Sequence, residues 1–353
     1  MPTRVRSFSK INLGLAVGPL REDGFHTLTT VYQTLQLHDV VSVTATPSAE
    51  TSITLTSNHK GVPRTEAGSA DRNTAYRIIL KTLERLDLTA AVEIHIDKRL
   101  PVQGGMGAGS ANAIAAMLGF ERELQVALPP ADRLEVASEV GSDVPLYLLG
   151  GTVLGLGRGE EVYPLPDSPP MHCVIALPDI GVSTALAFQQ LDAASLTSNS
   201  SVDKLKQLSR ALAAVWSTTG VELGPSGIAH MNRLDCDPND DSSELASEMR
   251  DVRGDLAENP RLALVRTGIE NDFEEVVFSQ HPSLRSTKRD LLGSSSESAY
   301  YAALSGSGSA LFGLYESQAH ARAAQHRVQQ RGVKAILTET LPRRSYWHTM
   351  FAE

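Results

Sequence analysis

The stretch RLPVQGGMGAGSANAIAAM (residues 99–117) places four glycines between a strand-like segment and a helix-like segment. Before it, residues 90–100 alternate apolar and polar side chains, which predicts a half-buried strand. After it, apolar residues recur at helical spacing, and Ser110 has a side chain suited to an N-cap. A glycine turn ahead of a helix presents unpaired N–H groups to an anion. Taken alone, this segment fits a phosphate site and a plain surface turn equally well.

The composition is that of an ordinary globular chain, with 353 residues, 41% of them hydrophobic and 21% charged. This length allows two domains with buried cores. The net charge of −9 argues against a nucleic-acid binder, although it permits a local basic pocket. Only Cys173 and Cys236 are present, which excludes a disulfide framework and a cysteine-type zinc site. Because no signal-peptide pattern and no run of about 18 apolar residues occurs, we expect a cytoplasmic protein that does not enter a membrane.

The order of the predicted elements favours an α+β fold over a doubly wound sheet, because strands and helices do not alternate regularly. Residues 4–17 are predicted to form a strand pair or one long strand. Further strands are predicted at 38–46, 51–57, 90–100 and 333–341, a strand hairpin at 143–165, a buried strand leading into a helix at 171–191, and a strand–turn–strand at 302–315. Helices are predicted at 72–88 with Asn73 as N-cap, at 130–141, and around 285–293 and 317–331. Residues 194–262 are polar and turn-rich around one helical piece at 203–216, so we interpret them as an insertion.

The glycine stretch fails two familiar phosphate-binding patterns. A P-loop requires a lysine where Ser110 stands, and a dinucleotide loop requires a third glycine at that same position after Gly105 and Gly107. What remains, from Pro101 to Asn112, resembles the Pro-x-x-x-Gly-Leu-Gly-Ser-Ser-Ala signature of the GHMP kinases (galacto-, homoserine, mevalonate and phosphomevalonate kinases). In that superfamily the loop wraps nucleotide phosphates without a loop lysine.

Four further motifs narrow the resemblance. Four segments are similar to blocks of the GHMP kinases that act on 4-diphosphocytidyl-2-C-methyl-D-erythritol: FSKINLGLAVGPLREDGFHTLTTVYQTLQLHD (8–39), GSDVPLYLLGGTVLGLGRGE (141–160), NDFEEVV (271–277) and LSGSGSALFGLY (304–315). The likeness covers most of residues 7–191 and 268–339 in the same order. It implies a nucleotide-binding α+β domain over residues 1–165 and a ferredoxin-like α+β domain over 166–353, which carries the polar insertion.

The resemblance also implies roles for individual residues. Asp143 would be the general base, and Lys10 would orient it and stabilise developing charge. The residues expected to hold ATP are Pro101, Gly104, Gly105, Met106, Gly107, Ala108, Gly109, Ser110 and Ala111, with Asn73 and Lys98 near the adenine. The residues expected to hold the substrate are Asn12, Phe25, His26, Tyr32 and Phe188, with His26 on the cytosine. No residue is assigned to a metal of its own, and Mg²⁺ is expected to accompany ATP.

Several of these residues also have plain structural interpretations. Asn73 could be only a helix N-cap, Lys98 only a charge at the end of a strand, and Phe188 only a core aromatic residue. Without the resemblance, Asp143 would be interpreted as a turn residue and Lys10 as a solvated strand lysine. The second glycine segment, SGSGSA (305–310), would be a linker by itself, but its apolar flanks predict a turn whose small residues permit close backbone approach.

Three positions depart from the family pattern. Phe25 stands where tyrosine is usual, which keeps ring stacking but loses a phenol hydrogen bond. Ala108 replaces a common glycine, and a left-handed backbone there would cost roughly 1–2 kcal/mol. Ala111 replaces a common serine, which removes one possible contact to phosphate or magnesium.

The expected function is ATP-dependent phosphorylation of the 2-hydroxyl of 4-diphosphocytidyl-2-C-methyl-D-erythritol, a step in non-mevalonate isoprenoid precursor synthesis. One alternative is another GHMP kinase of the homoserine or mevalonate type. A second is a nucleotide-binding regulator with reduced catalysis. The expected partner is a small molecule, with no nucleic acid and no membrane, and the protein is expected to be a monomer or a homodimer.

Overall fold

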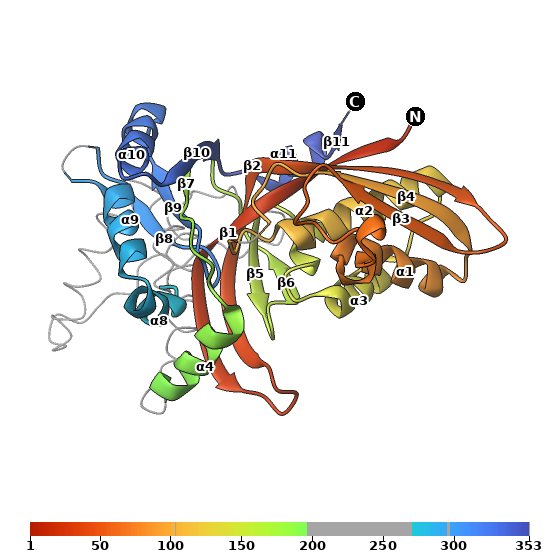
Figure 1. Ribbon diagram of the computed structural model, residues 1–353, viewed down its shortest axis with the longest axis horizontal. Helices are drawn as coiled ribbons and strands as arrows, with labels where there is room; N and C mark the ends of the chain where they lie inside the picture. The colour runs from red at the N-terminus through yellow and green to blue at the C-terminus, as the bar shows by residue number, and fades with distance from the viewer. Residues whose placement is uncertain (103, 196–269, 295–296, 353) are drawn as a thin grey trace, which may run out of the picture.

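The computed structural model describes residues 1–102, 104–195, 270–294 and 297–352. These residues form two antiparallel-rich sheets with helices packed against each of them (Figure 1). The expected 203–216 helix, most of the proposed 194–262 insertion and Cys236 lie outside the described residues. Within the described ranges, no helix combines the length and the apolar character that a membrane crossing would need.

The larger sheet has seven strands and is built around one long hairpin. Strand β1 (Thr3–Leu20) pairs antiparallel with β2 (His26–Pro47). The remaining members are β3 (Ser52–Ser57), β4 (Ala90–Asp97), β5 (Thr152–Leu156), β6 (Glu161–Pro164) and β11 (Phe351–Ala352). The pairing register of β1 shifts between Phe8 and Lys10 and again between Asn12 and Gly14. Such irregularities redirect side chains, and these two flank Lys10 and Asn12.

Helices cover one face of this sheet. Helix α1 (Thr74–Leu86) begins after Asn73, whose side-chain oxygen accepts from the Ala75 N–H and confirms the predicted cap. Helix α2 (Ala108–Leu124) packs on β1 and β2, and its length is buried almost throughout. Helix α3 (Pro130–Val140) lies beside α1.

Two local predictions in this region were wrong. The N-cap of α2 is Gly107, in the left-handed conformation, and Ser110 lies inside the first turn. The predicted hairpin over 143–165 is confined to β5 and β6, because Pro145–Leu148 forms a short 3-10 helix (η3) before it. In both cases the element begins directly after a glycine with positive φ: α2 begins after Gly107, and β5 begins after Gly151.

The smaller sheet has the strand order β10-β7-β9-β8, from β7 (His172–Leu177), β8 (Tyr301–Leu304), β9 (Leu311–Tyr315) and β10 (Lys334–Glu339). Helices α9 (Pro282–Leu292) and α10 (Gln318–Gln330) pack against it, and α4 (Thr184–Ser195) packs on α8 (Phe273–Gln280). In β7, Cys173 and Ile175 face the larger sheet, while Val174 and Ala176 face these helices. Burial on both faces explains the continuous apolar run of β7.

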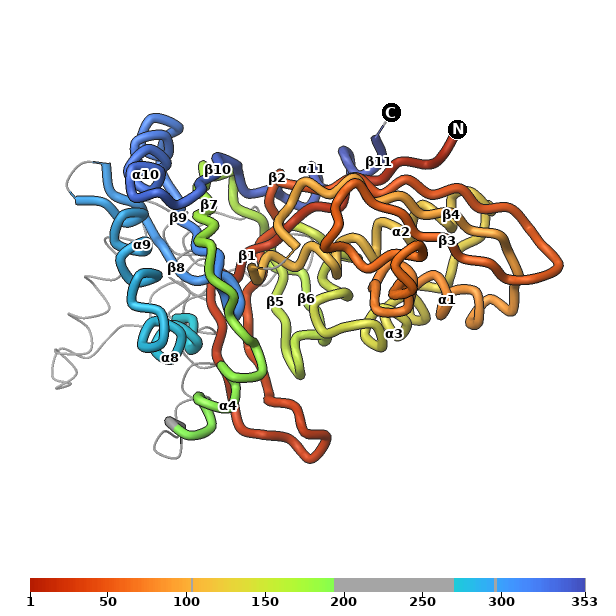
Figure 2. The backbone as a smooth tube through the Cα atoms, in the orientation of Figure 1, coloured from red at the N-terminus to blue at the C-terminus, as the bar shows by residue number. Residues whose placement is uncertain are grey.

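The β1–β2 hairpin joins the two halves of the molecule. Figure 2 shows it crossing from the sheet near α1–α3 to a position beside β7 and α4. Its residues Ile11, Leu13 and Val31 pack with Ile175 and Phe312 of the smaller sheet. Helix α11 (Arg343–Thr349) and β11 return the chain to β1, so the two ends lie side by side. The α+β class is confirmed, and the division at residue 165 stays a prediction.

Candidate active site

The glycine stretch forms a tight loop whose backbone only glycine adopts easily. Gly104, Gly105 and Gly107 have φ values of +134°, +76° and +67°. Gly107 caps α2, so the first N–H groups of a 17-residue helix open at this loop. Ala108 is the first helical residue and is absent from the described non-glycine residues with positive φ. The expected cost of alanine at this position therefore does not arise.

The other loop residues connect the glycine turn to its surroundings. The carbonyl of the buried Met106 accepts from the Lys10 N–H at 3.0 Å, which ties the loop to β1. The carbonyl of Gly109 accepts from the Thr74 hydroxyl at 2.6 Å, which ties it to α1. Pro101 and Ser110 are half-buried at the two ends of the loop, and Ala111 is buried in α2. The structure therefore brings together the described members of the expected phosphate loop.

Lys10 and Asp143 form an ion pair beside this loop. The Lys10 Nζ lies 3.2 Å from Asp143 Oδ2 and donates to Asn12 Oδ1 at 2.7 Å. Lys10 is almost fully buried, whereas a third of the Asp143 side chain is exposed. A Cβ atom on Gly107 would lie 3.1 Å from Lys10 Cγ, so the lysine runs directly under the loop. The pair therefore lies next to Gly107, the N-cap of α2.

Tyr32 completes the surroundings of Asp143. Its hydroxyl donates to Asp143 Oδ1 at 2.9 Å, and its ring lies 5.4 Å from the Lys10 ammonium group. Burial, reinforced by the Asp143 charge, raises the pKa of Tyr32 well above its ordinary value. The phenol therefore stays protonated and acts as a donor. Asn12 is held by Thr30, whose hydroxyl accepts from the Asn12 amide at 2.8 Å.

A second cluster lies at the far end of the β1–β2 hairpin. The His26 ring stacks on Phe188 of α4, with centroids 5.0 Å apart and an interplanar angle of 13°. Phe188 also meets the buried Phe273 edge-on at 4.9 Å. Phe25 is half-exposed, and the Arg158 guanidinium lies 4.9 Å from its ring centroid. The structure thus brings His26 and Phe188 together with Phe188 resting on His26, whereas the Phe25 ring lies against Arg158.

Asn73 and Lys98 have structural partners. Asn73 uses its oxygen as the α1 cap and its amide as a donor to the Pro63 carbonyl at 3.0 Å. The Lys98 ammonium group lies 2.5 Å from Asp39 Oδ2 in a buried pair, and burial lowers the pKa of Lys98. Both plain interpretations are therefore geometrically satisfied. An additional contact to adenine stays a prediction.

A second glycine loop, residues 305–310, buttresses the first. The Ser305 hydroxyl donates to the Gly105 carbonyl at 3.0 Å, and the Ala310 N–H donates to the Gly104 carbonyl at 3.3 Å. A Cβ atom on Gly105 would lie only 2.0 Å from the Ser305 carbonyl oxygen. The predicted close backbone approach is therefore present. It joins the two sheets at the site.

Sequence reasoning missed several residues that position this site. The buried Asn271 amide donates to the Leu304 and Gly306 carbonyls, each at 2.8 Å, and so anchors the second glycine loop. The Tyr147 hydroxyl donates to the Gly107 carbonyl at 3.1 Å. Asn271 belongs to the quoted NDFEEVV motif, which was a usable signal. Tyr147 and Arg158 lie within the GSDVPLYLLGGTVLGLGRGE motif. Their partners Gly107 and Phe25 are distant in sequence, however, so the motif did not predict these contacts.

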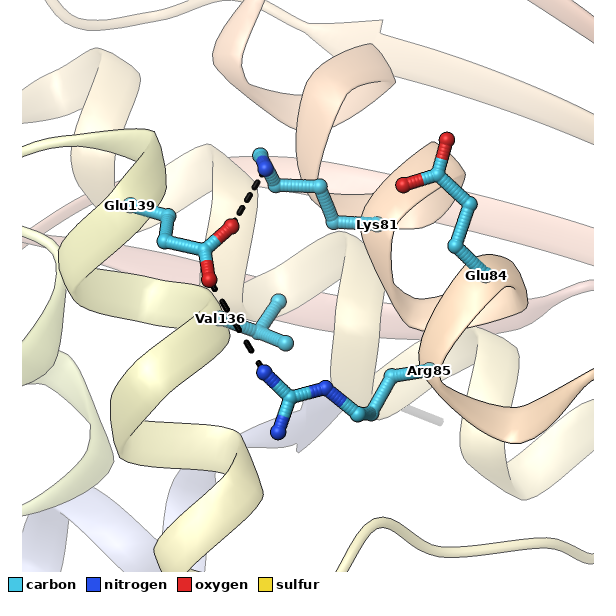
Figure 3. A pocket seen from close by; sticks show the side chains of 5 residues that line it. All are labelled: Lys81, Glu84, Arg85, Val136 and Glu139. Atoms are coloured by element: carbon cyan, nitrogen blue, oxygen red, sulfur yellow. Dashed lines mark hydrogen bonds and ion pairs between the residues drawn. The ribbon is translucent and has the colours of Figure 1, made fainter.

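A charged depression between α1 and α3 lies apart from these residues (Figure 3). Glu139 bridges Lys81 and Arg85 there, while Glu84 points away from the other side chains. Charged side chains line this depression, and Val136 is its one apolar lining residue. We interpret it as a helix–helix contact.

Comparison with known proteins identifies the fold. The family model described as GHMP kinases N terminal domain matches residues 73–151, and that described as GHMP kinases C terminal matches 246–334. A crystal structure of 4-(cytidine 5'-diphospho)-2C-methyl-D-erythritol kinase superposes with a TM-score of 0.62 at 23% identity, covering 96% of this chain and 98% of that chain. A crystal structure of a homoserine kinase from Cytophaga hutchinsonii superposes with a TM-score of 0.59 at 18% identity, covering 97% of this chain and 96% of that chain. The two sheets, the glycine loop and these matches define a GHMP-type small-molecule kinase.

Sequence relatives narrow this class. The chain is 33% identical over 314 residues to a 4-diphosphocytidyl-2-C-methyl-D-erythritol kinase from Solibacter usitatus, covering 89% of this chain and 81% of the relative. It is 30% identical over 331 residues to the enzyme of that name from Lachnospira eligens, and the match covers 93% of this chain and 94% of the relative. The chain belongs to the 4-diphosphocytidyl-2-C-methyl-D-erythritol kinase family.

Proposed function

We propose that the protein transfers the γ-phosphate of ATP to the 2-hydroxyl of 4-diphosphocytidyl-2-C-methyl-D-erythritol. The observation that carries this proposal is the Lys10–Asp143 pair, 3.2 Å apart, beside the glycine loop at the N-terminus of α2. Phosphoryl transfer to an alcohol needs a held triphosphate, an oriented hydroxyl and positive charge near the transferred group. This arrangement offers a group for each of the three: the N-terminus of α2, the Asp143 carboxylate and the Lys10 ammonium group.

The phosphates would be held by backbone rather than by a loop lysine. The N–H groups of the first turn of α2 have no intrahelical partner, and the helix dipole places partial positive charge there. Gly105 and Gly107 permit the positive φ values that turn the backbone toward this helix end, and their missing Cβ atoms leave room for Ser305 and Tyr147 to pack against the loop. The Ser110 hydroxyl in the same turn can add a further hydrogen bond.

Asp143 and Lys10 would act on the acceptor hydroxyl. Asp143 keeps a third of its side chain exposed and can accept the hydroxyl proton, while Tyr32 holds its other oxygen. The buried Lys10 ammonium group can stabilise charge on the transferred phosphoryl group. Asn12, which accepts from Lys10, keeps that ammonium group in place.

Mg²⁺ is expected to arrive with ATP. Among the described residues, no cluster of three or more histidine, cysteine, aspartate or glutamate side chains could hold a metal ion. Mg²⁺ takes many of its ligands from substrate phosphates and water and only one or two from protein carboxylates. Ser110 is the loop hydroxyl that could contact the ATP-bound ion, and Ala111 offers no second hydroxyl. When bound, the ion would neutralise phosphate charge.

The cytidine would lie at the His26 cluster. Phe25 offers an exposed ring for stacking, with Arg158 on that ring. Homoserine and mevalonate kinases act on acceptors that contain no base, so the ring cluster favours the cytidyl substrate over both. A pure nucleotide-binding regulator is disfavoured because the Lys10–Asp143 pair is intact. The domain limits at 165 and the insertion at 194–262 remain proposals, as does a monomeric or dimeric state.

ADP release with Mg²⁺ and ATP tests this function. The acceptor panel holds 4-diphosphocytidyl-2-C-methyl-D-erythritol, homoserine and mevalonate, each with the wild type and with Asp143→Asn. Turnover on the cytidyl compound alone, abolished in Asp143→Asn, is the expected result. Turnover on another acceptor would discard the His26 assignment, and ATP binding without any turnover would favour the regulator. Unchanged turnover in Asp143→Asn would refute the proposed role of the carboxylate.

A further inference from the structure

Helix α11 returns the chain to the segment that carries Asp143. This segment continues directly into η3, and the last carbonyl groups of a short helix find no donor within the helix. Helix α11 supplies donors to two of them. The Tyr346 hydroxyl donates to the Tyr147 carbonyl at 2.7 Å, in a buried hydrogen bond. The indole N–H of Trp347 donates to the Leu149 carbonyl at 3.0 Å, so α11 holds the end of η3.

The buried ring of Tyr346 contacts the chain near both members of the catalytic pair. A Cβ atom on Gly150, the residue that follows η3 and its cap, would lie 2.3 Å from Cδ1 of this ring. Only glycine therefore lets the ring pack so closely on this backbone. The ring also packs on Phe8, with centroids 5.3 Å apart. Phe8 precedes Lys10 by two residues in β1, so one side chain touches the segments that carry Lys10 and Asp143.

Tyr147 extends these contacts to the glycine loop. Its hydroxyl donates to the Gly107 carbonyl at 3.1 Å, while its own carbonyl accepts from Tyr346. The Gly107 carbonyl also accepts from the Ala111 N–H at 2.9 Å, in the first turn of α2. Burial raises the pKa of Tyr346, so its hydroxyl stays protonated and remains a donor. The glycine loop, η3 and α11 therefore form one hydrogen-bonded series that begins at Tyr346.

We propose that Tyr346 is a positioning residue for phosphoryl transfer, which keeps Asp143 in place beside Lys10, 3.2 Å away. The inference rests on the proposed function. Lys10 and Tyr32 hold the Asp143 carboxylate, but they can fix its position only while its backbone stays where it is. Tyr346 secures that backbone through η3, and it secures β1 through Phe8. Because misplacing a reacting group by about 1 Å can cost about 100-fold in rate, a partial release should be visible in kcat.

The test compares Tyr346→Phe with Tyr315→Phe. Tyr315, at the end of β9 in the smaller sheet, also buries a hydroxyl that donates to a backbone carbonyl at 2.7 Å, that of Leu291. Both variants keep the ring and lose one such hydrogen bond, so urea denaturation should show similar losses of stability.

Steady-state ADP release with Mg²⁺, ATP and the cytidyl substrate then separates position from stability. Tyr346→Phe should lower kcat about tenfold and leave KM for ATP and for the acceptor within about twofold of the wild type. Tyr315→Phe should keep the wild-type kcat. Trp347→Phe removes the second donor to η3 and should lower kcat by a smaller factor, again without a change in KM.

The outcomes separate this role from the proposed function. A wild-type kcat in Tyr346→Phe overturns the role of Tyr346 alone. An equal loss of kcat in Tyr315→Phe also overturns it, because the loss would then follow stability. If the wild type acts on homoserine or mevalonate instead, the proposed substrate is wrong, and the same comparison of kcat on that acceptor decides the role of Tyr346. A wild type inactive on all three acceptors refutes the proposed function and this role with it.

Discussion

Replacing Gly105 by alanine should uncouple the two glycine loops. Gly105 has a φ of +76°, so any side chain there costs roughly 1–2 kcal/mol of backbone strain. The added Cβ would also lie 2.0 Å from the Ser305 carbonyl oxygen, which is backbone and cannot rotate away. Separating the loops breaks the hydrogen bonds from Ser305 to Gly105 and from Ala310 to Gly104, worth about 1 kcal/mol each. The free energy of unfolding should therefore fall by about 3–4 kcal/mol.

Gly332→Ala is the matched control for this change. Gly332 has a φ of +79°, but no atom lies within 4 Å of the Cβ that alanine would add. It should lose only the strain of about 1–2 kcal/mol. Urea denaturation measures both variants, and steady-state kinetics should show KM for ATP raised at least about tenfold in Gly105→Ala alone, equivalent to about 1.4 kcal/mol. Equal losses of stability with an unchanged KM for ATP would refute the reasoning.

Three further predictions concern single side chains. Tyr32→Phe removes the hydroxyl that donates to Asp143, and a hydrogen bond to a charged group contributes about 1.5–3 kcal/mol. In a steady-state assay, kcat should therefore fall about tenfold or more while KM for ATP stays unchanged. Asn271→Asp loses both amide donations to the second glycine loop, so urea unfolding should show a loss of about 2–3 kcal/mol. The hydrogen bond from Lys81 lowers the pKa of Glu139, so Glu139→Gln should destabilise the fold by at most about 1 kcal/mol at pH 7. That difference should vanish as the pH falls below about 4, where the wild-type carboxylate gains the proton that the unfolded chain already binds.

The same measurements carry their own controls. An unchanged kcat in Tyr32→Phe would show that the phenol does not hold Asp143 for the reaction. Asn271→Ala should behave like Asn271→Asp, since the lost donors dominate, and full stability in either would contradict the anchoring role. Glu84→Gln removes a charge from the same rim without an ion pair drawn to it, so its free energy of unfolding at pH 7 should be nearly that of the wild type.

Local patterns in the sequence were sufficient for most elements. The alternation in residues 90–100 and the Asn73 cap predicted β4 and the start of α1, because both depend on neighbouring residues only. The sequence predicted Ser110 as the N-cap of α2, but the structure uses Gly107, three residues earlier, because this glycine adopts a positive φ. The short α11 and β11 carry too few residues for a periodic signal and were missed.

The sequence by itself determined the family, the α+β class and the position of the glycine loop, because ordered motifs and glycine spacing are local properties of the chain. Only the tertiary structure decided which side chains meet. Lys10 and Asp143 come together because two register shifts in β1 aim the lysine under a loop nearly 100 residues later. The contact of Asp192 with His26 depends on how α4 packs on α8 beside the hairpin. Packing of elements distant along the chain creates these juxtapositions, and no pattern of neighbouring residues encodes them.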